Sequence, residues 1–167
     1  MTAVSTRWRP MTAADLPAVN ALAALIHPGY PEDAAVFAER LRLYPPGCRV
    51  LERDGELAAY VVSHPWVDRA PPPLNTLLGE LPARPTTYYL HDLALMPEVR
   101  SSGAAAQAVT ALIEQARYEQ LPSLSLIAVN GSAGFWRRQG FEAVEDQALA
   151  KKLRSYGDDA QFMVRRL

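Results

Sequence analysis

Apolar residues recur every three or four positions in four stretches of the chain, which is the spacing of a helix with one buried side. Thr12 and Asp15 have the spacing of a capping box just before the first stretch. Proline and glycine close the first two stretches, and Gly140 follows the last and shortest one. The predicted helices cover residues 15–26, 31–44, 103–119 and 132–139.

Segments of strand length alternate with these helices. Residues 48–53 and 57–64 are separated by Asp54-Gly55, a pair typical of a hairpin turn. Residues 124–129 form a continuous apolar run, which is the pattern of a strand buried on both faces. Further strands are predicted over 7–11, 88–96, 141–145 and 160–166, while 147–156 fits either a helix or a loop.

The order of these elements predicts one α/β domain over residues 1–167, built on a mixed sheet. The strand–helix–strand unit over 88–129 should be parallel, with a right-handed crossover. The segment 65–87 breaks the pattern, because it holds six of the 14 prolines and is too long for an ordinary loop. A short helix is predicted inside it over 74–81.

Composition and charge exclude several classes of protein. Of 167 residues, 17 are basic and 18 are acidic, and the arginines are scattered, so the basic stripe of a nucleic-acid binder is absent. No apolar run reaches the roughly 20 residues of a membrane span, and no signal peptide is visible before Pro10. The single cysteine, Cys48, is expected to be a buried small side chain. We therefore expect a cytoplasmic protein without nucleic-acid or membrane partners.

A short motif opens the predicted helix at 103. Arg100 to Ala105 read Arg-Ser-Ser-Gly-Ala-Ala, and the small side chains leave the first N–H groups of the helix open to an anion such as a pyrophosphate. The P-loop pattern needs Gly-Lys-Ser/Thr and the dinucleotide fingerprint needs three spaced glycines, and both are absent here. Taken alone, the motif also fits a plain helix cap at Ser101 or Ser102.

A second motif follows the buried strand, where Asn130 to Phe141 read Asn-Gly-Ser-Ala-Gly-Phe-Trp-Arg-Arg-Gln-Gly-Phe. Together the two motifs resemble the GNAT family, the GCN5-related N-acetyltransferases. That family has Gln/Arg-x-x-Gly-x-Gly/Ala at the start of this helix and Asn-x-x-Ala-x-x-Phe/Leu-Tyr-x-x-x-Gly-Phe after the next strand. The matching residues are Arg100, Gly103, Ala105, Asn130, Ala133, Gly140 and Phe141.

The resemblance implies a fold and a binding site. The fold is a mixed, mostly antiparallel sheet of about seven strands, as many as the sequence predicts, with helices on both faces. Its fourth and fifth strands are parallel and splay apart to hold acetyl-CoA as co-substrate. Residues 93–95 and Asn130 would bond the pantetheine arm, the amides of 100–105 the pyrophosphate, and Trp136 would lie near the sulfur. The residues expected to bind acetyl-CoA are Leu93, Ala94, Leu95, Arg100, Ser101, Ser102, Gly103, Ala104, Ala105, Asn130, Ser132 and Trp136, with the Ser132 hydroxyl also capping the short helix.

Two positions depart from the family pattern. Ser101 stands where the family usually has glycine, which is harmless unless its φ is positive. Trp136 stands where many members have a tyrosine that protonates the departing CoA thiolate, and an indole N–H cannot give up a proton at neutral pH. Either Tyr156 serves as the acid, or the thiolate leaves unassisted, since a thiol pKa is about 8.5. Tyr156 also fits an aromatic residue of a turn packed on the sheet.

Direct attack on a thioester needs an unprotonated amine, so a base must take the proton. His91 lies on the strand beside the implied thioester position, and a histidine occupies the equivalent strand in some family members that act on arylalkylamines. Because strand side chains alternate, Asp92 is expected on the opposite face, unable to orient His91, and is a reserve base. His91 also fits a packed strand residue. His27 and His64 each precede a proline and are interpreted as structural, so no metal site is expected.

The sequence thus predicts a cytoplasmic, acetyl-CoA-dependent N-acetyltransferase. Its acceptor would be a primary amine on a small molecule, acetylated by direct attack in a ternary complex without an acyl-enzyme. The segment 65–87 is expected at the mouth of the acceptor site, where it would limit acceptor size. Trp136 motivates an alternative, a non-catalytic acyl-CoA-binding regulatory module of the same fold, and a nucleotide-binding α/β domain is a third interpretation. A monomer and a homodimer both fit the chain.

Overall fold

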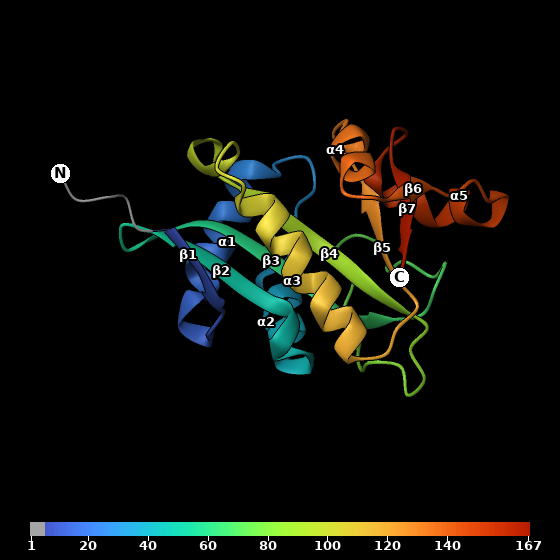
Figure 1. The fold of residues 1–167 in the computed structure, drawn as a ribbon, viewed down its shortest axis with the longest axis horizontal. Helices are drawn as coiled ribbons and strands as arrows, with labels where there is room; N and C mark the ends of the chain where they lie inside the picture. The colour runs from blue at the N-terminus through green and yellow to red at the C-terminus, as the bar shows by residue number, and fades with distance from the viewer. Residues whose placement is uncertain (1–5) are drawn as a thin grey trace.

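The computed structural model describes residues 6–167 and arranges them around one seven-stranded sheet with helices on both faces (Figure 1). The strand order is β1-β2-β3-β4-β5-β7-β6, in which β4 and β5 are parallel and the other neighbours are antiparallel. The strands are β1 (Thr6–Pro10), β2 (Cys48–Arg53), β3 (Glu56–Trp66), β4 (Thr87–Leu95), β5 (Ser123–Ala128), β6 (Glu142–Ala143) and β7 (Gln161–Arg166). This confirms the predicted mixed α/β fold. The first five residues, which belong to the predicted domain and to the stretch in which no signal peptide is expected, lie outside the described residues.

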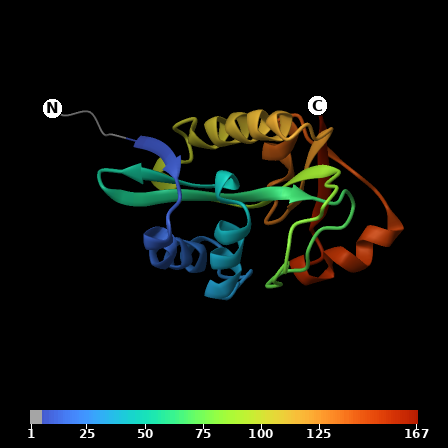
Figure 2. The same cartoon turned by 90° about the horizontal axis from the view of Figure 1, so that it is seen from below.

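Five α-helices cover the sheet. α3 lies across one face, and α1 and α2 lie on the other (Figure 2). α4 and α5 lie at the C-terminal end of the sheet, beside β5 and β7. The helices are α1 (Leu16–Ile26), α2 (Ala34–Leu43), α3 (Ala104–Tyr118), α4 (Ala133–Arg138) and α5 (Gln147–Leu153). Single turns of 3-10 helix occur at 13–15, 45–47, 97–99 and 154–156.

Local signals explain where most helices begin and end. Asp15 accepts a hydrogen bond from the Thr12 backbone N–H at 2.8 Å, as the capping spacing predicts. The second helix begins at Ala34 rather than at 31, because Asp33 is still extended and stands at its N-cap. The helix predicted over 74–81 is absent, and the prolines on both sides leave this segment irregular.

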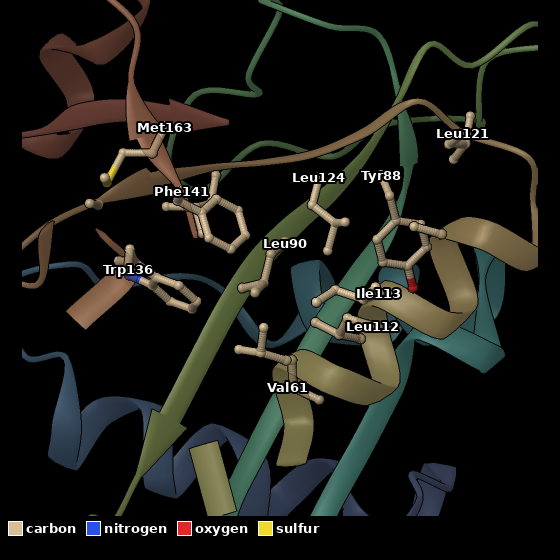
Figure 3. Close-up of a cluster of buried hydrophobic side chains, with 14 of the residues drawn as sticks. Val61, Tyr88, Leu90, Leu112, Ile113, Leu121, Leu124, Trp136, Phe141 and Met163 are labelled. Carbon is tan, nitrogen blue, oxygen red and sulfur yellow. The ribbon is translucent and has the colours of Figure 1, made fainter. Parts of the chain in front are cut away.

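Each face of the sheet has its own core. The core under α3 joins the inner side of that helix to β3, β4 and β5, and includes Leu112, Leu124 and Trp136 (Figure 3). The core on the other face joins α1 and α2 to β2 and β3, and includes Phe37 and Tyr60. As a result β4 lies between α3 on one side and the loop connecting α1 to α2 on the other.

The parallel strands β4 and β5 are paired only at their beginnings. The pairs are Tyr88 with Leu124, Tyr89 with Ser125, and Leu90 with Leu126. Beyond these pairs β4 continues along β3, while β5 continues along β7. The two strands therefore diverge toward the start of α3 and of α4, which is the predicted splay (Figure 1).

A β-bulge interrupts the alternation of side chains on β4. Asp92 pairs with Val62 of β3, but the next pair joins Leu90 to Ser63, so His91 is an extra residue without its own partner. His91 and Asp92 consequently point to the same side of the sheet, toward the α1–α2 loop. The expectation that they face opposite sides was wrong, because alternation holds only in a strand without a bulge.

Candidate active site

A cavity of about 550 Å³ occupies the place where β4 and β5 part. It runs from the N-terminal end of α3, along the outer part of β4, to the α1–α2 loop. One end carries Arg100 and Ala105 from the first motif and Asn130, Ser132, Phe135 and Trp136 from the second, whereas residues 101–104 do not line it, and the other end carries His91 and Asp92. The residues that line it are Ile26, His27, Tyr30, Glu32, Leu74, His91, Asp92, Leu93, Ala94, Leu95, Arg100, Ala105, Val129, Asn130, Ser132, Phe135, Trp136 and Tyr156.

The end of the cavity at the start of α3 and α4 is called the donor end below, because the resemblance implies acetyl-CoA there. It is formed mostly by backbone groups. Leu93, Ala94 and Leu95 pair with β3 on one edge, and their other edge has no strand beside it. A strand edge of this kind offers N–H and C=O groups to an extended ligand. The Arg100 side chain donates from Nε to the Leu95 carbonyl at 3.1 Å, which fixes the turn between β4 and α3.

Several backbone N–H groups are open at the start of α3. Gly103, with φ of 84°, precedes the helix, and a Cβ built on it would meet nothing within 4 Å. The N–H groups of Gly103, Ala105 and Ala106 donate to no acceptor among residues 6–167, whereas Ala104 N–H donates to the Ser102 hydroxyl at 3.3 Å. Ser101 does not have a positive φ, so its replacement of glycine causes no backbone strain.

The second motif closes the donor end from the side of β5. Asn130 and Gly131 both have positive φ and turn the chain from β5 into α4. Ser132 lines the cavity, but its side chain makes no capping bond to α4, so that expectation was wrong. Trp136 is 7% exposed and packs edge-on against Phe141 (Figure 3) and against Phe135. It also lines the cavity.

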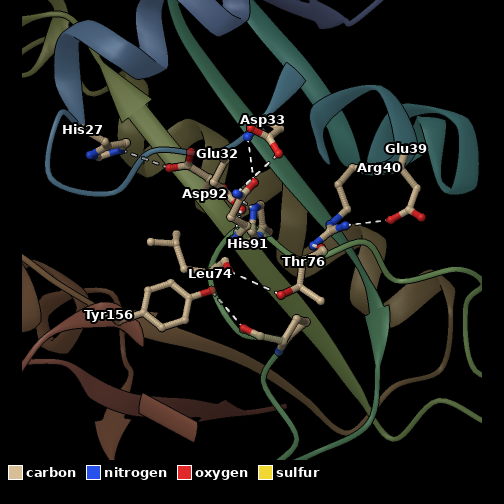
Figure 4. Close-up of polar contacts among 12 residues, drawn as sticks. His27, Glu32, Asp33, Glu39, Arg40, Leu74, Thr76, His91, Asp92 and Tyr156 are labelled. Atoms are coloured by element: carbon tan, nitrogen blue, oxygen red, sulfur yellow. Dashed lines mark hydrogen bonds and ion pairs between the residues drawn. The ribbon is translucent and has the colours of Figure 1, made fainter. Parts of the chain in front are cut away.

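His91 and Asp92 each have a partner from the α1–α2 loop (Figure 4). His91 Nε2 lies 2.8 Å from Glu32 Oε1. Asp92 accepts from the Tyr60 hydroxyl and lies 3.1 Å from His27 Nε2. Sequence reasoning missed Glu32, because it lies in a loop 59 residues from His91 and has no motif around it.

Burial and charge act in opposite directions on His27. Burial lowers its pKa, but the contact with Asp92 and the nearby charge of Glu32 outweigh burial and raise the pKa above the usual 6.5. His27 also lines the cavity, so its interpretation as a purely structural residue was incomplete.

Two tyrosines bring hydroxyl groups to the cavity wall. Tyr156 is 7% exposed and donates to the Pro72 carbonyl at 2.9 Å, and burial raises its pKa, so it keeps its proton at neutral pH. Tyr30, which sequence reasoning missed, reaches from the α1–α2 loop to Asn130 Oδ1 at 3.4 Å. Burial also raises the pKa of Tyr30.

The end of the cavity that holds His91 and Asp92 is called the acceptor end below. The segment between β3 and β4, residues 67–86, crosses this end and is called the strap. Leu74 lines the cavity, and its N–H donates to the Ser155 hydroxyl at 3.0 Å. The Glu39 carboxylate accepts from the N–H groups of Leu78 and Gly79 at 2.6 and 3.0 Å. Side chains from α2 and from the 154–156 turn thus supply the bonding that a helix would have supplied within the strap.

The remaining reactive side chains are buried away from the cavity. Burial lowers the pKa of His64 to about 3, and its Nδ1 donates to the Pro65 carbonyl at 2.9 Å. Cys48 is fully buried, as predicted, and burial raises its pKa to about 12. Within residues 6–167 no three potential ligands form a metal-binding group. Over the same residues, no helix has the length and apolar character needed to span a membrane.

Comparison with known proteins gives the chain a family. The model of the acetyltransferase (GNAT) family matches residues 15–141. None of the curated proteins compared with the chain matches its sequence.

Among solved structures, the chain is similar to the GNAT-like decarboxylase GphF in complex with isobutyryl-CoA, with a TM-score of 0.80, 16% identity, and 96% of this chain and 98% of that chain covered. It is similar to the NatC complex bound to Gag peptide and CoA, with a TM-score of 0.73, 16% identity, and 98% and 99% covered. It is also similar to N-acetylglutamate synthase from Neisseria gonorrhoeae, complexed with coenzyme A and N-acetyl-glutamate, with a TM-score of 0.67, 19% identity, and 99% and 36% covered. These likenesses concern the fold, whereas the family match spans most of the chain, and the chain therefore belongs to the acetyltransferase (GNAT) family.

Proposed function

We propose that the protein transfers the acetyl group of acetyl-CoA to the primary amine of a small molecule by direct attack in a ternary complex. The observation that carries this proposal is the continuity of one cavity. It connects the start of α3, where Ala105 lines it and has an open amide, with the free edge of β4 and with His91. A thioester bound along that edge would lie between a phosphate site at one end and a histidine at the other.

The donor end has the chemistry that acetyl-CoA requires. The amides of Gly103, Ala105 and Ala106 are unpaired and stand at the positive end of a 15-residue helix, which favours a pyrophosphate. The edge at 93–95 can bond an extended pantetheine arm, and Asn130 and Ser132 face it from the other side. When bound, acetyl-CoA supplies the thioester carbonyl that the amine attacks.

At the acceptor end, His91 is the proposed base and Asp92 a reserve base. His91 accepts a proton from the amine, the amine nitrogen forms the new C–N bond, and the C–S bond breaks with its electron pair leaving on sulfur. Tyr156 is the proposed donor of a proton to that sulfur, although its hydroxyl is engaged with Pro72. Tyr30, whose hydroxyl lies at the Asn130 side of the cavity, is a second candidate donor.

The charges at the acceptor end favour an amine over a carboxylate. Glu32 and Asp92 carry negative charge there, while Ile26 and Leu74 make part of the wall apolar. An ammonium group would be attracted to this end before it loses its proton, and an acidic acceptor or a dicarboxylic acyl-CoA would be repelled. The strap and the α1–α2 loop are bonded to each other by Asp33 N–H and Asn75 Oδ1 at 2.7 Å, which supports a small acceptor rather than a long peptide.

Release of CoA thiol with a panel of amines tests the proposal. We expect release that depends on small amines with an apolar side, at rates well above those with free amino acids or peptides. Acetyl-CoA binding without release by any amine would support the alternative of a regulatory module. Loss of carbon dioxide from malonyl-CoA in the absence of amine would instead indicate a decarboxylase, and both outcomes would overturn the proposal.

The proton donor is tested by Tyr156→Phe and Tyr30→Phe. The variant that lacks the true donor should lose activity with acetyl-CoA but recover with an acetyl thioester whose thiol is more acidic, because a better leaving group needs less protonation. A loss that does not depend on the leaving group would assign that tyrosine to structure alone.

We also propose a cytoplasmic location and a monomeric or homodimeric state. Support for the cytoplasmic location comes from the single, fully buried cysteine, which leaves no thiol for a disulfide. Sedimentation of the purified protein measures the oligomeric state directly.

A further inference from the structure

The His91 ring and the Glu32 carboxylate form a pair that is almost closed to solvent. Their side chains are 1% and 6% exposed, with Nε2 and Oε1 at 2.8 Å. The other carboxylate oxygen, Oε2, accepts from the Asn75 N–H of the strap at 3.1 Å. The other titratable groups around the pair are His27 from the end of α1, Arg40 from α2, Tyr60 and His64 from β3, Tyr89 and Asp92 from β4, and Tyr156 from the 154–156 turn.

The partner of Nε2 determines where the ring carries its proton. An ionised carboxylate only accepts hydrogen bonds, so the bond between His91 and Glu32 requires a hydrogen on Nε2. In a neutral imidazole the other nitrogen, Nδ1, then holds a free lone pair. Nδ1 is buried and has no partner among residues 6–167, and His91 lines the cavity. A buried acceptor without a partner is unfavourable, and a ligand N–H at Nδ1 would supply the missing hydrogen bond.

We propose that Glu32 is a positioning residue that holds His91 in the tautomer with hydrogen on Nε2, so that Nδ1 is the atom that takes the proton from the acceptor amine. This inference rests on the proposed role of His91 as base. When Nδ1 takes the proton, the ring becomes a cation whose Nε2–H still donates to Glu32. The carboxylate then faces the new positive charge, while the amine lone pair forms the bond to the acetyl carbon.

The same carboxylate connects this histidine to the strap. Glu32 receives two N–H donors, one from His91 and one from Asn75, and uses one oxygen for each. Glutamine has only one acceptor oxygen, so Glu32→Gln cannot satisfy both donors. Glu39→Gln is a control for weakened strap bonding, because Glu39 accepts from the strap N–H groups of Leu78 and Gly79, and from buried Arg40, without contacting His91.

The tautomer is measured in the wild-type protein by long-range ¹H–¹⁵N correlation of the histidine rings, at a pH where the rings are neutral. We expect hydrogen on Nε2 of His91 and on Nδ1 of His64, whose Nδ1 donates to the Pro65 carbonyl. His64 is thus an internal control of opposite tautomer in the same spectrum. Hydrogen on Nδ1 of His91 would overturn the inference, whatever the variants do.

Kinetics measure whether Glu32 acts through His91. We expect Glu32→Gln to lower kcat at least about tenfold, less than His91→Ala, with the Kd of acetyl-CoA unchanged. In the His91→Ala background Glu32→Gln should have no further effect, because the two residues act as one unit. Glu39→Gln should change the KM of the acceptor more than kcat.

The outcomes separate this inference from the proposed function. Full activity of His91→Ala would remove His91 as the base, and the positioning role of Glu32 would fail with it, while the proposed acetyl transfer would stand. The proposed function itself would fail if the wild-type protein released no CoA thiol with any amine. Loss of activity in His91→Ala together with additive effects of Glu32→Gln would leave the base in place and overturn the positioning role alone.

Discussion

The two ends of the cavity are built in different ways. The donor end consists of the free edge of β4 at 93–95 together with backbone groups, small residues and one helix N-terminus that belong to two short motifs. The acceptor end consists of side chains from the α1–α2 loop, β4, the strap and the 154–156 turn, joined by hydrogen bonds across large sequence separations. The comparison indicates that donor recognition depends on local backbone geometry, whereas acceptor chemistry depends on the tertiary fold.

The largest effect is expected at the acceptor end, from His91→Ala. Removal of a general base typically costs about 10²–10⁴-fold in rate, and kcat should fall within that range. The Kd of acetyl-CoA, measured by calorimetry, should stay the same, because His91 lies outside the donor end. A parallel loss of acetyl-CoA binding would show that the two ends are not independent.

Acid should destabilise the acceptor side of the fold through His64, which packs against Trp66 and Tyr89. The unfolded chain protonates this residue near 6.5, but burial lowers its pKa to about 3 in the fold. The contribution of His64 to the free energy of unfolding is therefore fully present above pH 6.5. It decreases as the pH is lowered, by about 3 kcal/mol near pH 4.5. The free energy of unfolding is measured by urea at several pH values for the wild type and for His64→Gln. It should decline more steeply with falling pH in the wild type, and equal slopes would contradict the role of His64.

A substitution at the donor end should weaken the binding of acetyl-CoA and leave kcat unchanged, which is the reverse of the effect expected from His91→Ala. Gly103 has φ of 84° and open space around it, so alanine there adds only backbone strain of about 1–2 kcal/mol. We expect Gly103→Ala to weaken acetyl-CoA binding about tenfold while kcat at saturating donor is kept. Gly79→Ala is the control, since Gly79 has a similar φ and similar space but lies in the strap. It should alter the KM of the acceptor instead.

The smallest effect is expected from Leu74→Ala, which shortens an apolar side chain of the strap that lines the acceptor end. The ratio of kcat/KM for bulky over small amines should rise severalfold, because one or two methylene groups are worth about 1–3 kcal/mol in a pocket. Leu77→Ala serves as control, because Leu77 is 55% exposed and does not line the cavity. An unchanged ratio for Leu74→Ala would remove the strap from acceptor selection.

The same division explains what could be predicted from the sequence. The motifs at 100–105 and 130–141 consist of residues close in the chain, so they could be recognised from the sequence, and the resemblance to the GNAT family implied the splayed strands between them. Hydrophobic periodicity also gave α3 and β5 to within a residue or so at each end. These features depend on local propensity and on one buried side, which a pattern of residues records.

No local pattern in the sequence predicts the contacts that build the acceptor end. The bulge at His91 inserts one residue against β3, and nothing in the residue types around it differs from a regular strand. Glu32 is one acidic residue among many until the fold brings it to His91. The strap carries leucines at the helical spacing 74, 77, 78 and 81, which predicted a helix, but it stays irregular and side chains elsewhere satisfy its backbone. Long-range contacts of this kind follow from the tertiary structure and not from spacing.

The short pairing of β4 with β5 has a consequence for the lifetime of the protein. Only three residue pairs join these strands, so β5, β7 and β6 are attached to the rest of the sheet over a short seam. An acyl donor bound as proposed would lie between β4 and β5 just beyond that seam, and a ligand at 100 times its Kd adds about 2.7 kcal/mol to the free energy of unfolding. Resistance to proteolysis should therefore rise and fall with the supply of the thioester, which couples the abundance of the enzyme to the metabolic state of its surroundings.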